Sequence, residues 1–344
     1  MTTDKKSRLF SFPRITFYLI AITAFYFGIR YVGKFHDVSA LIVQINPFWL
    51  ALALGFQVLT YAANAIILSV LLNGEGKILR STLFEISLVT LFVNQALPTG
   101  GLSGNGYLFN QLVKRKVAIS KVYNLLLTQT ICYYLAVILM LSISYLWYLN
   151  YVTINNQLIN YTVIVGYLYF IGLGVFIILL STKSSVRFLK KKLIKFPFFR
   201  KYLKKNKIPY LPDDQPGLFR SLLNHKRTSL IVMLIHVLII LLDIYTVYSI
   251  LHGFHLDLPI SKISFVVILS QIIAALPISP GALIAYESAM TYFLTKLGIP
   301  IHAALIVTLL FRFLTFWLPI PVGMLLYSNL SKAKHAPNLN HDQA

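Results

Sequence analysis

The chain has 344 residues, of which 57% are hydrophobic and only 12% are charged, and its formal net charge is +21. A water-soluble domain of this composition would expose much of its core to water, so we predict an all-α polytopic membrane protein. The single cysteine, Cys132, lies inside an apolar run, which excludes a disulfide framework and a thiolate metal site within one chain.

Residues 1–14 are polar and basic, and the apolar run that follows lacks a small-residue cleavage site, so this run is interpreted as a retained span and not a signal peptide. Six apolar runs reach the roughly 20 residues that a helix needs to cross a bilayer. They are residues 15–32, 47–72, 122–148, 159–181, 228–251 and 301–328. Two shorter runs, 81–97 and 260–276, bring the total to eight apolar segments.

The two shorter runs end in the same pattern. Each stops at Ala-Leu-Pro and continues through small residues to a glycine, in the turns Pro98–Gly101 and Pro277–Gly281. Apolar segments broken by Pro and Gly at corresponding places in two halves of a membrane protein point to a transporter's binding site. We therefore predict six full spans plus two re-entrant helical hairpins, each of which returns to the side from which it entered.

The positive charge is distributed unevenly along the chain. If residue 1 is inside and only the six long runs cross, 26 of the 31 Lys and Arg residues lie in inner segments. This asymmetry predicts that both termini are cytoplasmic, and it explains the basic composition without a nucleic-acid partner. If both hairpins crossed fully, giving eight spans, Lys114, Arg115 and Lys116 would lie outside, against the charge rule.

This topology divides one integral membrane domain, residues 1–344, into the halves 15–148 and 159–328. Each half consists of span, span, hairpin and span, and the two halves have opposite orientations, which is typical of transporters with inverted repeats. The basic cytoplasmic linker 182–227 contains the stretch Lys183–Lys207, with 11 Lys or Arg residues and no acid. This stretch either binds anionic inner-leaflet lipid or serves only as a topology anchor.

Non-helical backbone at membrane depth must be buried in protein or line a watery cavity. Helical patterns follow the two turns, at 103–113 and 282–296, so free N–H groups and the positive ends of two helix dipoles face the turns. Such ends favour a phosphate or carboxylate, although two structural kinks without a ligand remain the alternative. The candidate contacts in the turns are Pro98, Thr99, Gly100, Gly101, Pro277, Ser279, Pro280 and Gly281.

Ionisable residues inside the apolar runs are candidates for a site because each is costly in hydrocarbon. They are Glu85, His236, Asp243, Glu287 and Arg312. Glu287 is expected two turns into the helix that follows the second turn, and Arg312 near the middle of the last span. An ion pair of Arg312 with Glu287 or Asp243 would neutralise both partners, either as a structural lock or as part of a substrate site.

The sequence contains no motif of a self-powered or hydrolytic enzyme, neither G-x-S-x-G nor a Walker sequence. His252 and His255 have HxxH spacing, but without a helix or a nearby carboxylate they give little support for zinc. We therefore expect no enzymatic activity, no cofactor and no metal.

Three segments carry a resemblance to a known family: LPTGGLSGNGYL at 97–108, LPISPGALIAYE at 276–287 and FRFLTFWLPIPVG at 311–323. The chain resembles the flippase-like transmembrane domain of bacterial lysylphosphatidylglycerol synthases, the multiple peptide resistance factor family, and its stand-alone relatives. The resemblance implies movement of aminoacylated phospholipid between leaflets, with Glu287 and Arg312 as the family's glutamate and arginine. Because the chain ends about sixteen residues after the last expected span, no synthase domain and no lysine transfer are expected.

The chain departs from the family pattern at several positions. Asn105 replaces a frequent acid in the first motif, and Tyr286 replaces a common arginine before Glu287. Ala282 and Ile284 stand where glycines are common, and the basic residue frequent near Asn64 is missing.

The expected function is therefore a lipid translocase of the bacterial cytoplasmic (inner) membrane that moves an anionic or aminoacylated phospholipid, with Asn105 and Asp243 as further substrate contacts. Two alternatives stay open. The chain is either a non-catalytic subunit that presents lipid to a separately encoded synthase or glycosyltransferase, or a small-solute carrier. Partners beyond membrane phospholipid would be that lipid-modifying enzyme or a second copy of the chain.

Overall fold

The computed structural model describes residues 45–74, 78–96, 102–151, 157–180, 225–276 and 284–332. Every regular element within these ranges is a helix, as expected. The expected first span at 15–32, nearly all of the basic linker and both Pro-Gly turns lie outside the described residues.

Five stretches of the described chain are long and apolar enough to cross a membrane. They are α3 (Pro47–Leu72), α6 (Ile119–Tyr151), α7 (Gln157–Leu180), α11 (Lys226–Gly253), and a last stretch formed by α14 (Ile301–Arg312), the π-helical turn η3 (Phe313–Trp317) and α15 (Pro319–Lys332). Each coincides with an expected span. Five of the six predicted spans are thus confirmed by length and composition.

Local sequence explains where α3 begins and ends. The Asn46 side chain accepts a hydrogen bond from the Phe48 N–H at 3.0 Å, and Pro47 occupies the first turn, where its missing N–H leaves no helical bond unmade. The helix stops at Asn73, whose φ of 48° lies in the left-handed region. An Asn-Pro start and a left-handed Asn end therefore delimit α3.

The five stretches differ in how much of their surface the protein covers. In the most apolar window of α7 22% of the residues are buried, whereas in the last stretch 56% are buried. Because lipid accepts apolar side chains that water would not, the exposed Leu168 and Phe176 of α7 fit a lipid-facing helix. The last stretch has the largest buried share of the five, and it carries Arg312.

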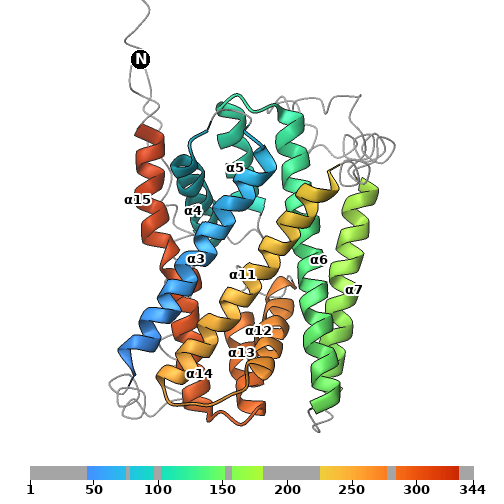
Figure 1. Cartoon of the computed structure of the whole chain (residues 1–344), viewed down its shortest axis with the longest axis vertical. Coiled ribbons are helices and arrows are strands. Elements are labelled where there is room, and N and C mark those ends of the chain that lie inside the picture. Colours follow the sequence, from blue (N-terminus) through green and yellow to red (C-terminus); the bar gives the residue numbers. More distant parts are fainter. Residues whose placement is uncertain are drawn as a thin grey trace, which may run out of the picture.

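Two pairs of short helices complete the described fold. α4 (Arg80–Ala96) packs against α5 (Leu102–Lys114), and α12 (Ile260–Ala275) packs against α13 (Ala285–Lys296). With 17 and 16 residues, α4 and α12 are shorter than a typical span. Figure 1 shows α4 and α5 in one half of the bundle's height and α12 and α13 in the other half.

Each short pair packs against a long stretch that belongs to the other predicted half of the chain. α4 packs against α15, which belongs to the second half, whereas α12 packs against α6, which belongs to the first. α3 and α11 pack against each other and run side by side in opposite directions, as Figure 1 shows. The two halves are therefore interlocked and do not sit as separate bundles.

One helix start differs from the prediction. The helix expected at 282–296 begins at Ala285, so Glu287 is in its first turn and not two turns inside. The cause is Ile284, whose φ of 74° is incompatible with a right-handed helix. Residues 282 and 283 lie outside the described part of the chain.

The two ends of the bundle differ in how many basic residues they carry. At one end of the bundle, α3, α5, α7 and α15 end and α4, α6 and α11 begin. This end carries eight basic residues: Arg80, Lys114, Arg115, Lys116, Lys121, Lys226, Arg227 and Lys332. The opposite end carries Lys262 and Lys296, at the start of α12 and the end of α13. Among the described Lys and Arg residues, this leaves Arg312 inside the bundle.

Candidate functional site

The last stretch is interrupted just after Arg312. The N–H of Leu318 donates to the carbonyl of Phe313 at 2.8 Å, which makes one π-helical turn, and Pro319 has no N–H to offer the carbonyl of Thr315. The carbonyls of Leu314 and Thr315 are therefore free of the usual helical partners.

Both freed carbonyls accept hydrogen bonds from other helices. The Tyr61 hydroxyl on α3 donates to the carbonyl of Leu314, and the Gln95 amide at the end of α4 donates to the carbonyl of Thr315 at 3.0 Å. Within a membrane, broken helices persist only where such partners satisfy the backbone. The interruption thus ties the last stretch to α3 and to the first short pair.

Arg312 forms a buried ion pair with Glu287 on α13. The Arg312 Nε donates to Glu287 Oε1 at 2.7 Å, and the two side chains are 11% and 15% exposed. The guanidinium carbon lies 4.8 Å from the centre of the Tyr286 ring and 4.7 Å from that of Phe316. Of the two partners that the sequence left open, the structure pairs Arg312 with Glu287 and not Asp243.

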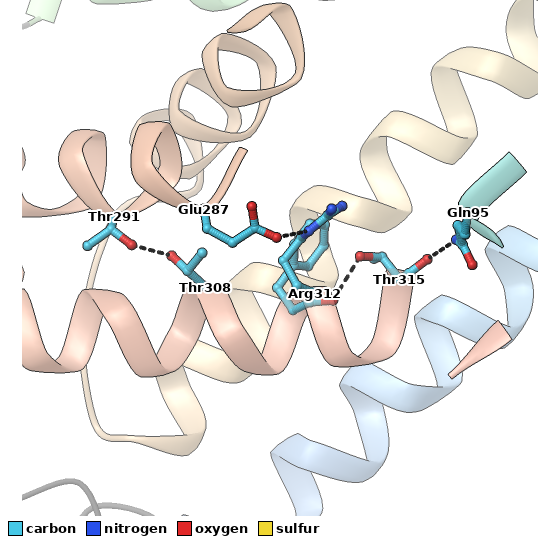
Figure 2. A network of polar contacts seen from close by, with 7 residues as sticks. Gln95, Glu287, Thr291, Thr308, Arg312 and Thr315 are labelled. Atoms are coloured by element: carbon cyan, nitrogen blue, oxygen red, sulfur yellow. Dashed lines mark hydrogen bonds and ion pairs between the residues drawn. The ribbon is translucent and has the colours of Figure 1, made fainter. Parts of the chain in front are cut away.

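Figure 2 shows how this pair connects the two short helix pairs. Gln95 of the first pair lies on one side and Glu287 of the second on the other, with Thr315 and Arg312 of the last stretch between them. Thr315 also donates to the carbonyl of Phe311 at 2.9 Å. The two short pairs thus bond to the last stretch at neighbouring positions, Thr315 and Arg312.

The ion pair leaves two of its polar atoms without a hydrogen-bond partner in the described part of the chain. Glu287 Oε2 and Arg312 Nη2 are both buried and have no hydrogen-bond partner within the described ranges. A buried donor or acceptor without a partner costs free energy, more so when it is charged. One acceptor and one donor therefore remain available to a ligand or to water.

The start of α13 is strained beside this pair. Ile284 is a β-branched residue at φ 74° and ψ −49°, a backbone conformation that non-glycine residues rarely adopt. Its carbonyl accepts from the N–H of Ser288 at 2.8 Å. The neighbouring turn residues Pro277, Ser279, Pro280 and Gly281 lie outside the described residues.

An acidic cavity of about 340 Å³ adjoins the pair. It is lined by Tyr133, Ile239, Ile240, Asp243, Gln271, Ala274, Ala275 and Tyr286. Gln271 donates to Asp243 Oδ2 at 3.5 Å and Gln57 is a second hydrogen-bonding neighbour of the carboxylate, while Asp243 Oδ1 has no partner among the described residues. Tyr286 connects this cavity with Arg312, on whose guanidinium it stacks.

A second, amide cavity of about 490 Å³ lies beside the first short pair. Its lining includes Asn105, the site residue predicted on α5, and His236, seven positions before Asp243 on α11. The full lining is Asn64, Leu68, Ser87, Thr90, Leu91, Asn94, Asn105, Leu108, Gln129, Thr130, Tyr133, Tyr134 and His236. Tyr133 lines both cavities, so they share one wall.

The first short pair holds its own turn together. Asn94 near the end of α4 accepts from the N–H of Gly104 in the first turn of α5 at 2.8 Å, and Ser103 donates to the carbonyl of Val93 at 3.1 Å. A methyl group on Gly104 would overlap the Asn94 side chain and displace it from this hydrogen bond. One of the N–H groups that we predicted to face an anion thus bonds to protein. Pro98, Thr99, Gly100 and Gly101 lie outside the described residues.

Several polar residues at this site were not predicted from the sequence. Gln57, Gln129, Gln271 and Tyr133 are uncharged and lie inside apolar helices, where only ionisable residues were considered as candidates. The useful signal would have been any amide within an apolar run, because an amide in hydrocarbon also needs a partner. In contrast, the predicted Glu85 lines neither cavity.

The described residues bring no three His, Cys, Asp or Glu side chains together in a way that could hold a metal ion. The expectation that His252 has neither a helix nor a carboxylate nearby was wrong, because His252 lies in the last turn of α11 and its Nε2 is 3.4 Å from Asp257 Oδ1. The site's charge is therefore carried by Arg312, Glu287 and Asp243.

Among curated proteins, no match to the chain was found. A family profile described as the lysylphosphatidylglycerol synthase transmembrane region matches residues 16–323, which covers all three segments on which the resemblance rested. The chain therefore belongs to the family of the lysylphosphatidylglycerol synthase transmembrane region.

Proposed function

We propose that this chain is a membrane lipid translocase that moves an anionic or aminoacylated phospholipid between the leaflets of the bacterial cytoplasmic membrane. Family membership supports a role connected with membrane lipid. The observation that carries the proposal is the buried Arg312–Glu287 pair, which has one unsatisfied donor and one unsatisfied acceptor and lies between two short helix pairs.

In this proposal the short pairs are re-entrant hairpins that enter from opposite faces. The end with most of the described Lys and Arg residues is cytoplasmic, so α4 and α5 enter from the cytoplasm and α12 and α13 from outside. The halves 15–148 and 159–328 are then inverted repeats, as in transporters whose substrate binds near the membrane centre. The exchanged packing of α4 on α15 and of α12 on α6 supports this arrangement.

The lipid phosphate would bind at Arg312, whose planar guanidinium suits oxyanions and whose stacking on Tyr286 and Phe316 fixes its orientation. Thr99 to Gly101 and Ser279 to Gly281 would supply N–H groups from the two turns. Glu287 would act as the counterion that holds Arg312 when no lipid is bound. Asp243, buried beside Gln271, would tune the charge and couple proton movement to transport.

Arg312→Ala tests the proposal. We expect the purified variant, in vesicles containing fluorescent phosphatidylglycerol, to lose lipid movement between leaflets as measured by quenching of outer-leaflet label. Arg115→Ala serves as the matched control, because Arg115 bonds to Gln111 at the basic end, away from both cavities. If Arg312→Ala moves lipid at the wild-type rate, and a cooperative thermal unfolding transition shows that the variant is folded, the role of Arg312 is rejected.

A second function is supported by the family itself, since the profile describes the membrane region of a synthase. The chain would then present lipid to a separately encoded synthase or glycosyltransferase, without catalysing a reaction itself. Co-purification with such an enzyme, together with loss of its lipid product and an unchanged leaflet distribution when the chain is deleted, would favour this function over translocation.

A further inference from the structure

The amide cavity is chemically different from the region around Arg312. Its lining consists of amides, hydroxyls, aromatic rings and one imidazole, and none of the residues found to line it is Asp, Glu, Lys or Arg. His236, the only titratable group apart from two tyrosines in this lining, is 6% exposed. The cavity therefore offers hydrogen bonds without a fixed charge.

The hydrogen-bonding role of His236 follows from its neighbour. The backbone carbonyl of Gln129 is a hydrogen-bond partner of the imidazole, and a carbonyl can only accept, so one ring nitrogen carries the proton. Nε2 of the neutral ring is then an acceptor, and it is buried with no partner in the described part of the chain. The Gln129 side-chain oxygen Oε1 is a second buried acceptor in the same condition.

Other groups of the lining are partly used. Asn64 donates through Nδ2 to the carbonyl of Thr60 at 2.9 Å, which leaves its oxygen as an acceptor. Asn94 uses its oxygen on Gly104, which leaves its NH₂ as a donor. The lining thus offers donors as well as acceptors, and the rings of Tyr133 and Tyr134 form an aromatic wall beside them.

This arrangement favours hydroxyl groups over other headgroup chemistry. A hydroxyl donates one hydrogen bond and accepts others, so a set of them can satisfy the Nε2 and Oε1 acceptors and the Asn94 donor together. A phosphate has no proton to donate to the two acceptors, and an ammonium ion would lack a carboxylate in this cavity. The C–H face of a polyol can pack against the tyrosine rings.

We propose that the amide cavity binds the neighbouring hydroxyls of a neutral polyol, a sugar or glycerol unit, in the headgroup of the lipid. This inference rests on the proposed function, because it assumes that the cargo is a lipid. Because Tyr133 lines both cavities, the amide cavity lies beside the acidic cavity, and in this proposal the polyol occupies the amide cavity while the phosphate binds at Arg312. The polyol part, and not only the phosphate, would then select the lipid.

The test measures binding without transport. The full chain, purified in a detergent without sugar, is titrated with monoglucosyl diacylglycerol, phosphatidic acid or plain diacylglycerol, and the complexes are counted by native mass spectrometry. We expect the glucolipid to bind about tenfold more tightly than diacylglycerol. His236→Phe and Gln129→Leu should each weaken glucolipid binding by roughly tenfold, because each removes a buried acceptor, and should leave phosphatidic acid binding unchanged.

Matched variants separate this effect from general damage. His252→Phe makes the same replacement on α11 outside both cavities, and Ser249→Ala removes a buried hydroxyl outside them, so both should bind the glucolipid like wild type. His236→Gln, which restores an acceptor, should recover part of the affinity that His236→Phe loses. Recovery would show that a hydrogen bond, and not the fold, was lost.

Two results would overturn the inference: equal binding of glucolipid and diacylglycerol by wild type, or an undiminished preference in both cavity variants. If free methyl glucoside binds as tightly as the glucolipid and responds to the same variants, the hydroxyl chemistry stands and its source is a soluble polyol. Glucolipid preference with no lipid movement in vesicles would contradict the translocase proposal alone.

Discussion

Arg312 is held by two aromatic rings and one carboxylate, and among these described groups Glu287 alone supplies the negative charge that stabilises the buried guanidinium. The rings of Tyr286 and Phe316 attract the guanidinium but bring no negative charge. If Glu287 is neutralised, a buried cation remains without a counterion, which is far more costly than losing an exposed ion pair.

Glu287→Gln should therefore destabilise the protein strongly, by roughly 3 kcal/mol or more, because the amide keeps the shape of the side chain but not its charge. Thermal unfolding in detergent measures the effect. Asp257→Asn is the control, since the Asp257 side chain is 92% exposed beside His252 and its loss should not shift the unfolding temperature measurably. Equal shifts of the unfolding temperature in the two variants would contradict the claim that Glu287 stabilises a buried charge at Arg312.

At Ile284 we predict a substitution that stabilises the protein. The φ of 74° at this residue suits glycine, and a strained β-branched residue costs on the order of 1–3 kcal/mol. Ile284→Gly should therefore raise the unfolding temperature by a few degrees, despite the greater freedom of glycine in the unfolded chain. Ile301→Gly, at the exposed start of α14, has no such strain to relieve and should lower the unfolding temperature. A loss of stability in Ile284→Gly would show that the strain is absent.

At the level of elements, close contact between α4 and α5 depends on a single glycine. The N–H of Gly104 reaches the Asn94 side chain only because no Cβ intervenes. Two residues later on the same helix, a Cβ on Gly106 would meet nothing within 4 Å. These two glycines form a matched pair in one helix.

Gly104→Ala should thus separate α4 from α5 and destabilise the protein by about 1–3 kcal/mol. Gly106→Ala should be neutral or slightly stabilising, because alanine is the better helix former. Both are measured by thermal unfolding, and lipid movement should fall in Gly104→Ala alone. Indistinguishable variants would mean that the contact between Gly104 and Asn94 does not hold the first short pair.

The helices could be predicted from the sequence to a large extent, for a physical reason. A bilayer fixes the length of an apolar run, so the expected 47–72 and 228–251 lie close to α3 and α11. The two short segments were predicted because Pro and Gly end them. The π-helical turn was not predicted, although Pro319 signals that the carbonyl of Thr315 needs a partner from elsewhere.

The candidate site could be predicted less well, because its contacts join helices far apart in the chain. Spacing left Arg312 with two possible partners, and packing of α13 beside α14 selects Glu287. The start of α13 was placed too early because no local rule requires Ile284 to adopt a positive φ. The amide cavity is formed by residues of α3, α4, α5, α6 and α11, a combination that no local pattern indicates.

For the whole molecule, the packing of each short pair against the last span of the opposite half has a mechanical consequence. α4 contacts α15 and α12 contacts α6, so movement of either short pair would change its packing against a long stretch of the other half. A methyl group on Gly323 of α15 would overlap Phe92 of α4 and lie 3.2 Å from the Leu88 carbonyl, which shows how close this contact is. In the proposed translocase, alternating access would arise from the joint movement of both halves around Arg312.

Cryo-electron microscopy of the full chain in phosphatidylglycerol nanodiscs would test this mechanism directly, because it shows the bilayer and any bound headgroup together. The proposal predicts that α4–α5 and α12–α13 each extend only part of the way across the bilayer, from opposite faces, with headgroup density next to Arg312. Uninterrupted crossings by both pairs, or lipid density confined to the outer surface of the bundle, would contradict it.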